Sequence, residues 1–492
     1  MPPEPDTAVI DDEREAAAAD AWEVTGNPYL AGVYEPVTDE RTDDNLEVIG
    51  EIPDDLEGVY VRNGPNPRYS APGRYHWFDG DGMLHALRFK DGRASYRNRW
   101  VRTRAFDEEA KVHDALFAGV MENPRDNPPL GLRLPLKDSA NTDLVVFRQR
   151  LLALWYLAGE PYSLDPVTLE NLGVDDFEGT RPCLVSAHAK VDEQTGELLF
   201  FDYGPVRPYM RYGVVGPSGA VTHLADIELP GPRLPHDMAA TEHYSILMDL
   251  PLVADPVAAR QGRHKIMFDD SLPARFGVIP RHGAADEIRW FEADPCYVYH
   301  SINAWEEGDE IVLDLCRVTK PAPRQGAVGP LAKMLSYLRL DAHLYRYRFN
   351  LQTGATSEGY LDDDNTEFPT MNTSMLGRPT RYAYNMRISD EPTLLFDGIV
   401  KYDTSTGAST RHWFGPGRWG AEAPFAPRRG SAAEDDGYVV SFVHDENEGR
   451  SEVVILDAAD IAAGPVGRVL LRGRVPIGFH ACWVREDRLA SA

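Results

Sequence analysis

Residues 85–100 read HALRFKDGRASYRNRW, and this pattern decides the fold because it recurs along most of the chain. Two runs rich in apolar and aromatic residues flank Asp91-Gly92, where glycine permits the positive φ angle that a tight hairpin turn requires. Short apolar runs bounded by turn residues predict many more strands and few helices. The same arrangement predicts hairpins in residues 344–361 (LYRYRFNLQTGATSEGYL) and 399–414 (IVKYDTSTGASTRHWF).

The number of predicted hairpins favours a closed all-β architecture. No convincing alternation of strands and helices is present, and a closed form avoids exposed sheet edges. A propeller is the closed form that suits a chain of 492 residues. Two consecutive β-sandwich domains are the alternative, but they do not explain the histidines described below. We therefore predict a propeller over residues 28–492, preceded by a flexible, acidic N-terminal tail over residues 1–27.

Composition and charge narrow the functional class. Hydrophobic residues make up 43% of the chain, which is enough for a large core, and charged residues make up 26%. The formal net charge of −28 repels phosphates and argues against a nucleic-acid partner. The acidic first residues do not resemble a signal peptide and no apolar run could span a bilayer, so we expect a cytoplasmic protein. The four cysteines show no regular spacing, which indicates neither disulfides nor a zinc knuckle.

Four of the fourteen histidines lie in short apolar or aromatic runs. They are His188 in VSAHAK, His236 in RLPHDM, His300 in VYHSINAW and His480 in GFHACW. They are too far apart in sequence to share a helix, so they can meet only if a closed fold brings several strands to one axis. Neutral imidazole is a good ligand for iron, copper, zinc and nickel, and convergence would therefore indicate a metal site. For each histidine alone, a hydrogen-bonded structural role is the alternative interpretation.

Two glutamates support the hypothesis of a metal site. Glu367 in TEFPTMN and Glu422 in AEAPFAPR lie in apolar surroundings, where an unpaired charge would be costly. The ring N–H of a metal-bound histidine is a suitable donor for a buried carboxylate. A surface position is the alternative for either residue.

The chain resembles the carotenoid cleavage oxygenases, a family that also contains the animal retinal-pigment-epithelium isomerohydrolase and the lignostilbene dioxygenases. The resemblance runs from about Asn27 to the C-terminus and rests on motifs in the same order. They include GVYVRNGPNP, YHWFDGDGMLHAL, SANTDLV, SAHAKVDEQTGELLFFDYG, LPHDMAATEHYSILMDLPL, YHSINAW, EFPTMN, EAPFAPR and GFHACW.

The resemblance implies a seven-bladed β-propeller, with a few short helices capping the top face over the active site. It implies Fe(II) on the axis, held by His188, His236, His300 and His480. It also implies that Glu367 supports His300, that Glu422 supports His480, and that Thr142 in SANTDL crowds an open coordination position.

One position departs from the family pattern. The family usually has a glutamate directly after the Trp of an ALWE segment, where this chain reads ALWYLAGEP and has Tyr156. The partner of His236 is therefore open. Tyr156 could orient the ring through its hydroxyl or a water, or Glu160 could substitute from the following turn. We expect the metal to bind in either case, because an outer partner typically changes affinity by only about 10–100-fold.

The function implied by the resemblance is that of an Fe(II)-dependent dioxygenase. It would cleave a C=C bond of a carotenoid or apocarotenoid with O2 and release two carbonyl products, without an obligate protein partner. Cleavage of a stilbenoid or phenylpropene is an alternative, although such relatives tend to place a Lys where this chain has Trp155. An isomerohydrolase is a further alternative within the family. A propeller that binds without catalysis is the alternative from another class.

An apolar substrate of this kind is extracted from lipid. Weak peripheral membrane contact is therefore expected through residues 326–340 (GAVGPLAKMLSYLRL) and 115–121. The helical spacing of Leu331, Met334, Leu335 and Leu338 is equally typical of core packing.

Overall fold

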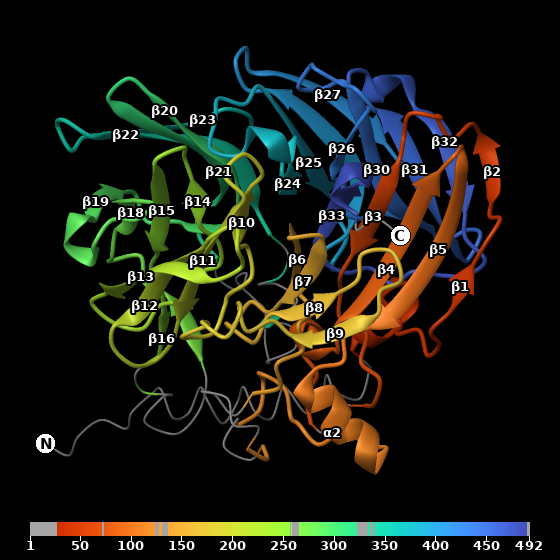
Figure 1. Cartoon of the computed structure of the whole chain (residues 1–492), viewed down its shortest axis with the longest axis horizontal. Coiled ribbons are helices and arrows are strands. Elements are labelled where there is room, and N and C mark those ends of the chain that lie inside the picture. The colour runs from red at the N-terminus through yellow and green to blue at the C-terminus, as the bar shows by residue number, and fades with distance from the viewer. Residues whose placement is uncertain are drawn as a thin grey trace, which may run out of the picture.

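The computed structural model describes residues 27–70, 73–123, 127–129, 136–255, 257, 265–321, 333–334, 338 and 340–489. The predicted tail thus lies outside the described residues, apart from Asn27. The described strands form antiparallel sheets arranged around a central region (Figure 1). This arrangement confirms the all-β class and the propeller.

Seven blades account for the sheets of the described residues when the ten-stranded sheet is taken as two blades. Blade 1 contains β1 (Thr42–Asp43), β3 (Gly58–Arg62), β4 (Met83–Lys90), β5 (Arg93–Trp100) and β33 (Ala481–Arg485). Blade 2 contains β6 (Asp143–Phe147), β7 (Arg150–Leu154), β8 (Tyr162–Leu164) and β9 (Asn171–Val174). Blade 3 contains β10 (Lys190–Asp192), β11 (Glu197–Tyr203), β12 (Tyr209–Val215) and β13 (Val221–Glu228).

The remaining blades follow in chain order. Blade 4 contains β14 (Ala239–Ala240), β15 (Tyr244–Asp249), β18 (Ala274–Pro280) and β19 (Arg289–Ala293), and β16 (Leu252–Ala254) pairs with β17 (Ile266–Phe268) beside it. Blade 5 contains β20 (Tyr297–Glu307), β21 (Glu310–Val318), β22 (Ala342–Asn350) and β23 (Thr356–Tyr360). Blade 6 contains β24 (Thr366–Thr370), β25 (Tyr382–Ile388), β26 (Phe396–Asp403) and β27 (Ala408–Trp413). Blade 7 contains β2 (Glu47–Gly50), β28 (Arg418–Gly420), β29 (Phe425–Pro427), β30 (Gly437–Asp445), β31 (Arg450–Asp457) and β32 (Pro465–Leu470).

The two ends of the chain meet in two blades. In blade 1, β3 pairs with β33 over five residues, from Gly58 opposite Arg485 to Arg62 opposite Ala481. In blade 7, β2 pairs with β32. Apolar side chains fill the space between the two sheets, and Tyr60 and Leu87 of blade 1 share a cluster with Tyr438 of blade 7. N-terminal and C-terminal strands thus complete the ring together.

Helices are few. One α-helix, α2 (Arg104–Val112), lies entirely within the described residues, and Figure 1 shows it at the edge of the ring. Short 3-10 turns connect other elements: η1 (Pro28–Leu30), η2 (Gly32–Tyr34), η3 (Trp77–Asp79), η5 (Ala285–Glu287), η6 (Thr373–Met375), η7 (Ile461–Ala463) and η8 (Glu486–Arg488). Of these, η3 contributes Trp77 and Phe78 to the pocket described below, so a short helix does lie over the site.

Candidate metal centre

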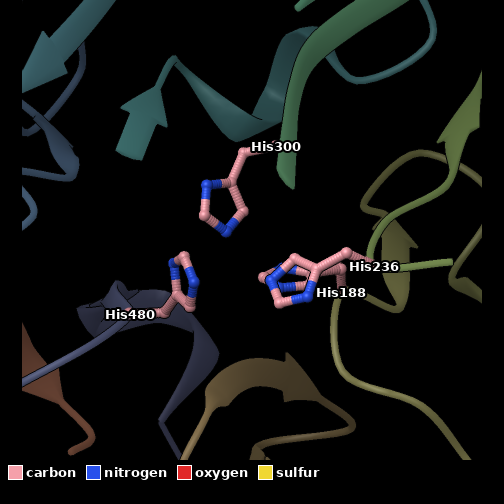
Figure 2. Close-up of side chains that lie close together, drawn as sticks. All are labelled: His188, His236, His300 and His480. Carbon is pink, nitrogen blue, oxygen red and sulfur yellow. The ribbon is translucent and has the colours of Figure 1, made fainter. Parts of the chain in front are cut away.

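The fold brings the four predicted histidines together. Each offers a ring nitrogen, and these nitrogens all lie within 4.8 Å of one another. Figure 2 shows the rings of His188, His236, His300 and His480 grouped around one point. All four residues are buried, with exposed fractions of 5–6%. A cluster of this density has the donor set for one metal ion with imidazole ligands.

Each histidine lies in or shortly before an end strand of a different sheet. His188 precedes β10, His236 comes shortly before β14 and His480 precedes β33. Strands of neighbouring blades contact one another there, including β6 with β10, β14 with β20 and β29 with β33. His300 lies within β20, where the register shifts on both sides of Ser301. Such a bulge re-aims a side chain, here toward the other three rings.

Both predicted glutamates contact histidine rings. Glu367 is fully buried in β24, and its carboxylate lies against Nδ1 of His300. An oxygen of Glu422 lies 3.0 Å from Nδ1 of His480. A ring that donates its Nδ1–H to a carboxylate leaves Nε2 free for a metal. Nε2 of His300, like Nε2 of His188, is buried without a hydrogen-bond partner among the described residues, as a metal-directed nitrogen should be.

The electrostatics suit metal binding. Burial, together with the positive charge that neighbouring rings would carry, holds the pKa of His188 and of His236 well below the ordinary value. The pKa of His300 is lowered for the same reasons. Burial also lowers the pKa of His480, but the charge and hydrogen bond of Glu422 outweigh that effect and raise it. His188, His236 and His300 are therefore held neutral, which is the protonation state that coordination requires.

An apolar pocket opens beside the histidines. Its volume is about 30 Å³, and it is lined by Trp77, Phe78, Thr142, Tyr156, His236, Tyr299, His300, Leu338, Leu340, Phe368, Leu394, Phe479 and His480. Thr142 donates its hydroxyl to Oδ1 of Asn141 (3.0 Å) and accepts the Tyr156 backbone N–H (3.2 Å). Thr142 thus lines the pocket with its hydroxyl bonded to two neighbouring groups. That Thr142 crowds an open coordination position stays a prediction.

Comparisons with known proteins agree with this geometry. The family model described as "Retinal pigment epithelial membrane protein" matches residues 34–485. The carotenoid 9,10(9',10')-cleavage dioxygenase 1 of Pisum sativum is 40% identical over 501 residues, covering 94% of this chain and 90% of that protein. The chain belongs to the carotenoid cleavage oxygenase family.

Other relatives of this oxygenase carry a range of names. The carotenoid cleavage oxygenase of Mycobacterium tuberculosis is 33% identical (93% of this chain, 97% of that protein), and the isoeugenol monooxygenase of Pseudomonas nitroreducens is also 33% identical (93% and 98%). The crystal structure of Pseudomonas brassicacearum lignostilbene dioxygenase superposes with a TM-score of 0.85 at 29% identity, covering 93% of this chain and 98% of that one. A cobalt-substituted apocarotenoid oxygenase of Synechocystis superposes with a TM-score of 0.80 at 28% identity (92% and 97%).

Tyr156 of this oxygenase lines the same pocket as His236, but no hydrogen bond joins the two side chains among the described residues. The His236 ring instead packs edge-on against Tyr299, with centroids 5.2 Å apart. The alternative that Glu160 replaces the missing carboxylate is wrong, because that side chain pairs with Arg104 (2.6 Å) and Arg181 (3.3 Å). Tyr156 thus lines the pocket of this oxygenase without a hydrogen bond to His236.

A polar cavity of about 240 Å³ also reaches the histidines, and sequence reasoning missed it. His188, His300, His480 and Glu422 line it together with Asp143, Lys190 and Asp237. Asp237 pairs with Lys190 (2.7 Å) and accepts both the backbone N–H and the hydroxyl of Ser301 (2.6 Å each). The sequence offered one indication of this cavity. Asp143, Lys190 and Asp237 each lie within two positions of Thr142 or of a predicted histidine ligand.

The expected membrane contact stays a prediction, because much of the segment that would make it lies outside the described residues. Met334 and Leu338 are buried, and Leu338 lines the apolar pocket, so core packing is confirmed for these two residues. Leu331 and Leu335 lie outside the described residues, as does most of 326–340. Within 115–121, Leu116 is 37% exposed whereas Phe117 is buried, and contact there stays a prediction. No helix in the described part of the chain is long and apolar enough to cross a membrane.

Proposed function

We propose that this oxygenase is an Fe(II)-dependent dioxygenase that cleaves a C=C bond of a carotenoid or apocarotenoid with O2 and releases two carbonyl products. The observation that carries the proposal is the cluster of four buried imidazoles beside a pocket with aromatic walls. Residues 28–492 would act as one oxygenase domain. His188, His236, His300 and His480 would hold the iron, which supplies the activation of O2 when bound.

The pocket supports an apolar, conjugated substrate. Trp77, Phe78 and Phe479 contact one another, with centroids of Trp77 and Phe479 4.5 Å apart. Phe368 stacks on the His480 ring at 4.6 Å. Flat aromatic surfaces can hold a polyene, exclude water and stabilise transient positive charge on the substrate. The side chains would therefore orient the double bond beside the metal, and Thr142 would restrict the space at one open coordination position.

Cleavage of a phenolic alkene is the second candidate, because an isoeugenol monooxygenase and a lignostilbene dioxygenase are among the relatives. Tyr156 could contact a substrate hydroxyl from the pocket wall. Trp155 favours the polyene, since it replaces a Lys that could bind a phenol and lines a separate small cavity. Relatives named as carotenoid cleavage dioxygenases point the same way.

Two measurements test the proposal. Protein purified without a metal-binding tag should contain about one iron per chain, and absence of iron would support a binding propeller without catalysis. The iron-loaded protein is then incubated under 18O2 with carotenoids, apocarotenals and hydroxystilbenes. We expect paired carbonyl products that each carry one labelled oxygen atom, formed from a carotenoid or apocarotenal. Cleavage of the hydroxystilbenes alone would establish the second candidate instead.

A further inference from the structure

The two glutamates of the centre share one arrangement. Glu367 accepts the backbone N–H of Phe368 (2.5 Å) and also contacts Nδ1 of His300. Glu422 accepts the backbone N–H of Ala481 and also contacts Nδ1 of His480. Each carboxylate thus holds a backbone amide of the site and faces the Nδ1 of one histidine. For Glu422 the amide is that of Ala481, so this carboxylate fixes the main chain beside His480 together with the His480 ring. The amide that Glu367 accepts is that of its own neighbour, Phe368.

Asp143 holds a related position at His188, with a hydrogen bond to the backbone and a longer approach to the ring. Its Oδ2 accepts the His188 backbone N–H at 2.9 Å and lies 3.8 Å from Nδ1 of the same residue. Asp143 is itself buried, with an exposed fraction of 8%, and its Oδ1 accepts the backbone N–H of Leu144 (2.7 Å). Among the described residues, His188 offers the only Lys, Arg or His side-chain nitrogen within 4.0 Å of the Asp143 carboxylate. The neighbouring cation, Lys190, pairs with Asp237 instead.

The backbone of His188 needs such an anchor. Its φ angle is +67°, in the left-handed region that non-glycine residues adopt only at a cost of roughly 1–3 kcal/mol. This conformation aims the ring at the other three histidines. The hydrogen bond from the His188 N–H to Asp143 stabilises it at the point where β10 begins.

We propose that Asp143 is a positioning residue for His188 and the third supporting carboxylate of the metal centre. The inference rests on the proposed function, because it requires that the four histidines hold a metal. The proposed role of Asp143 also bears on the missing glutamate at position 156, where this chain has Tyr156. The chain has no glutamate beside His236, yet three carboxylates still face the ring nitrogens of the centre, because Asp143 approaches His188 from the polar cavity.

Cobalt(II) is a suitable probe, because its absorption spectrum reports the coordination geometry without turnover. Native protein, Asp143→Asn and Asp143→Ala are loaded with cobalt and challenged with a chelator. The alanine variant loses both the backbone bond and the charge, so its cobalt affinity should fall by about 10–100-fold. The asparagine variant keeps an acceptor for the His188 N–H and loses only the charge, so its affinity should fall less. The cobalt absorption spectra of both variants should differ from that of the native protein.

Glu193→Gln is the matched control. Glu193 lines the same polar cavity but contacts Thr373, Arg485 and Arg488 rather than a histidine, so its cobalt affinity and spectrum should stay native. Asp143→Ala with native affinity and an unchanged spectrum would overturn the inference. If melting shows that the alanine variant does not fold, an unchanged spectrum and affinity in Asp143→Asn overturn it equally. Failure of the native protein to bind iron or cobalt would instead overturn the proposed function.

Discussion

At the residue scale, Glu367 shows how the centre depends on groups that do not themselves reach the metal. Its side chain is fully buried, and burial raises the pKa of this carboxyl to about 8. Such a residue is stable in the core only because donors surround it, namely the Phe368 N–H and the His300 ring. The same contacts hold the His300 ring with its Nε2 toward the other histidines.

Glu367→Gln should weaken metal binding by about 10–100-fold without abolishing it. Glutamine retains the shape and one acceptor oxygen, but it removes the carboxyl group that can ionise opposite the His300 Nδ1–H. The dissociation constant for cobalt or iron measures the effect. Glu170→Gln, at an exposed turn, is the control. Equal dissociation constants for the native protein and Glu367→Gln would show that the carboxylate does not support His300.

Tyr156→Glu should retain about one iron per chain. The change places a carboxylate in the wall that Tyr156 shares with His236, where it can accept the ring N–H, so the ligand set stays intact. Iron analysis of the purified variant measures the result, with Tyr156→Phe as the control for loss of the phenol alone. A variant that folds but cannot be loaded would mean that this wall of the pocket is built differently.

At the element scale, two motifs from opposite ends of the chain form one structural unit. Asn63 donates its backbone N–H to the His480 carbonyl (2.8 Å) and accepts the N–H of Phe479 (2.9 Å). The two segments lie so close that a Cβ on Gly64 would come within 2.8 Å of the Gly478 Cα. Glycine at both positions therefore permits the approach that places His480 on the axis.

Gly64→Ala should destabilise the protein by about 1–3 kcal/mol, because the added methyl group meets backbone that cannot move aside. The displaced segment carries His480, so metal content should fall as well. The free energy of unfolding measures the first effect, and the iron content of the purified protein measures the second. Gly359→Ala is the matched control, since a Cβ there has nothing within 4 Å. Native stability in Gly64→Ala would show that the two segments can separate at little cost.

At the scale of the whole molecule, ion pairs join separate blades. Asp192 ends β10 in blade 3, and its carboxylate pairs with Arg281 (2.9 Å), which follows β18 of blade 4. Arg378, between β24 and β25 of blade 6, lies 3.4 Å from the same carboxylate. Asp192 and Arg281 are almost fully buried. The cluster therefore fixes how three blades sit relative to one another.

Asp192→Asn should lower stability near pH 7 by about 1–3 kcal/mol, because the buried Arg281 loses one of its two carboxylate partners and keeps only Glu197 at 3.3 Å. Burial raises the pKa of Asp192, but hydrogen bonds from the Gln194 N–H and from Arg281 outweigh it and lower the pKa below the ordinary 3.8. The carboxylate thus contributes fully above about pH 4, and its contribution is lost as the pH falls through the lowered pKa.

Unfolding of the native protein and of Asp192→Asn between pH 2 and 7 measures this difference, which should shrink at the acid end. Asp270→Asn, at the exposed pair with Lys320, should leave stability unchanged. A difference in the free energy of unfolding between the native protein and Asp192→Asn that stays constant down to pH 2 would contradict the lowered pKa of Asp192.

Sequence patterns predicted much of this molecule because they are local. Hairpin turns such as Asp91-Gly92 lie between β4 and β5 as expected, since glycine and its neighbours decide a tight turn within a few residues. The four histidines and the two glutamates lie in apolar runs, where polar groups need partners, but other histidines do so too, and the family resemblance selected these residues. The family resemblance then supplied the number of blades.

The amino-acid sequence by itself determined the all-β class, the ring of blades and the identity of the residues that meet on its axis. The tertiary structure alone decided that Asp143 faces His188, that Glu160 pairs with arginines instead of His236, and that Leu338 turns into the pocket. Each of these contacts joins segments distant in sequence. Their partners depend on how neighbouring blades are placed in space, which no local pattern encodes.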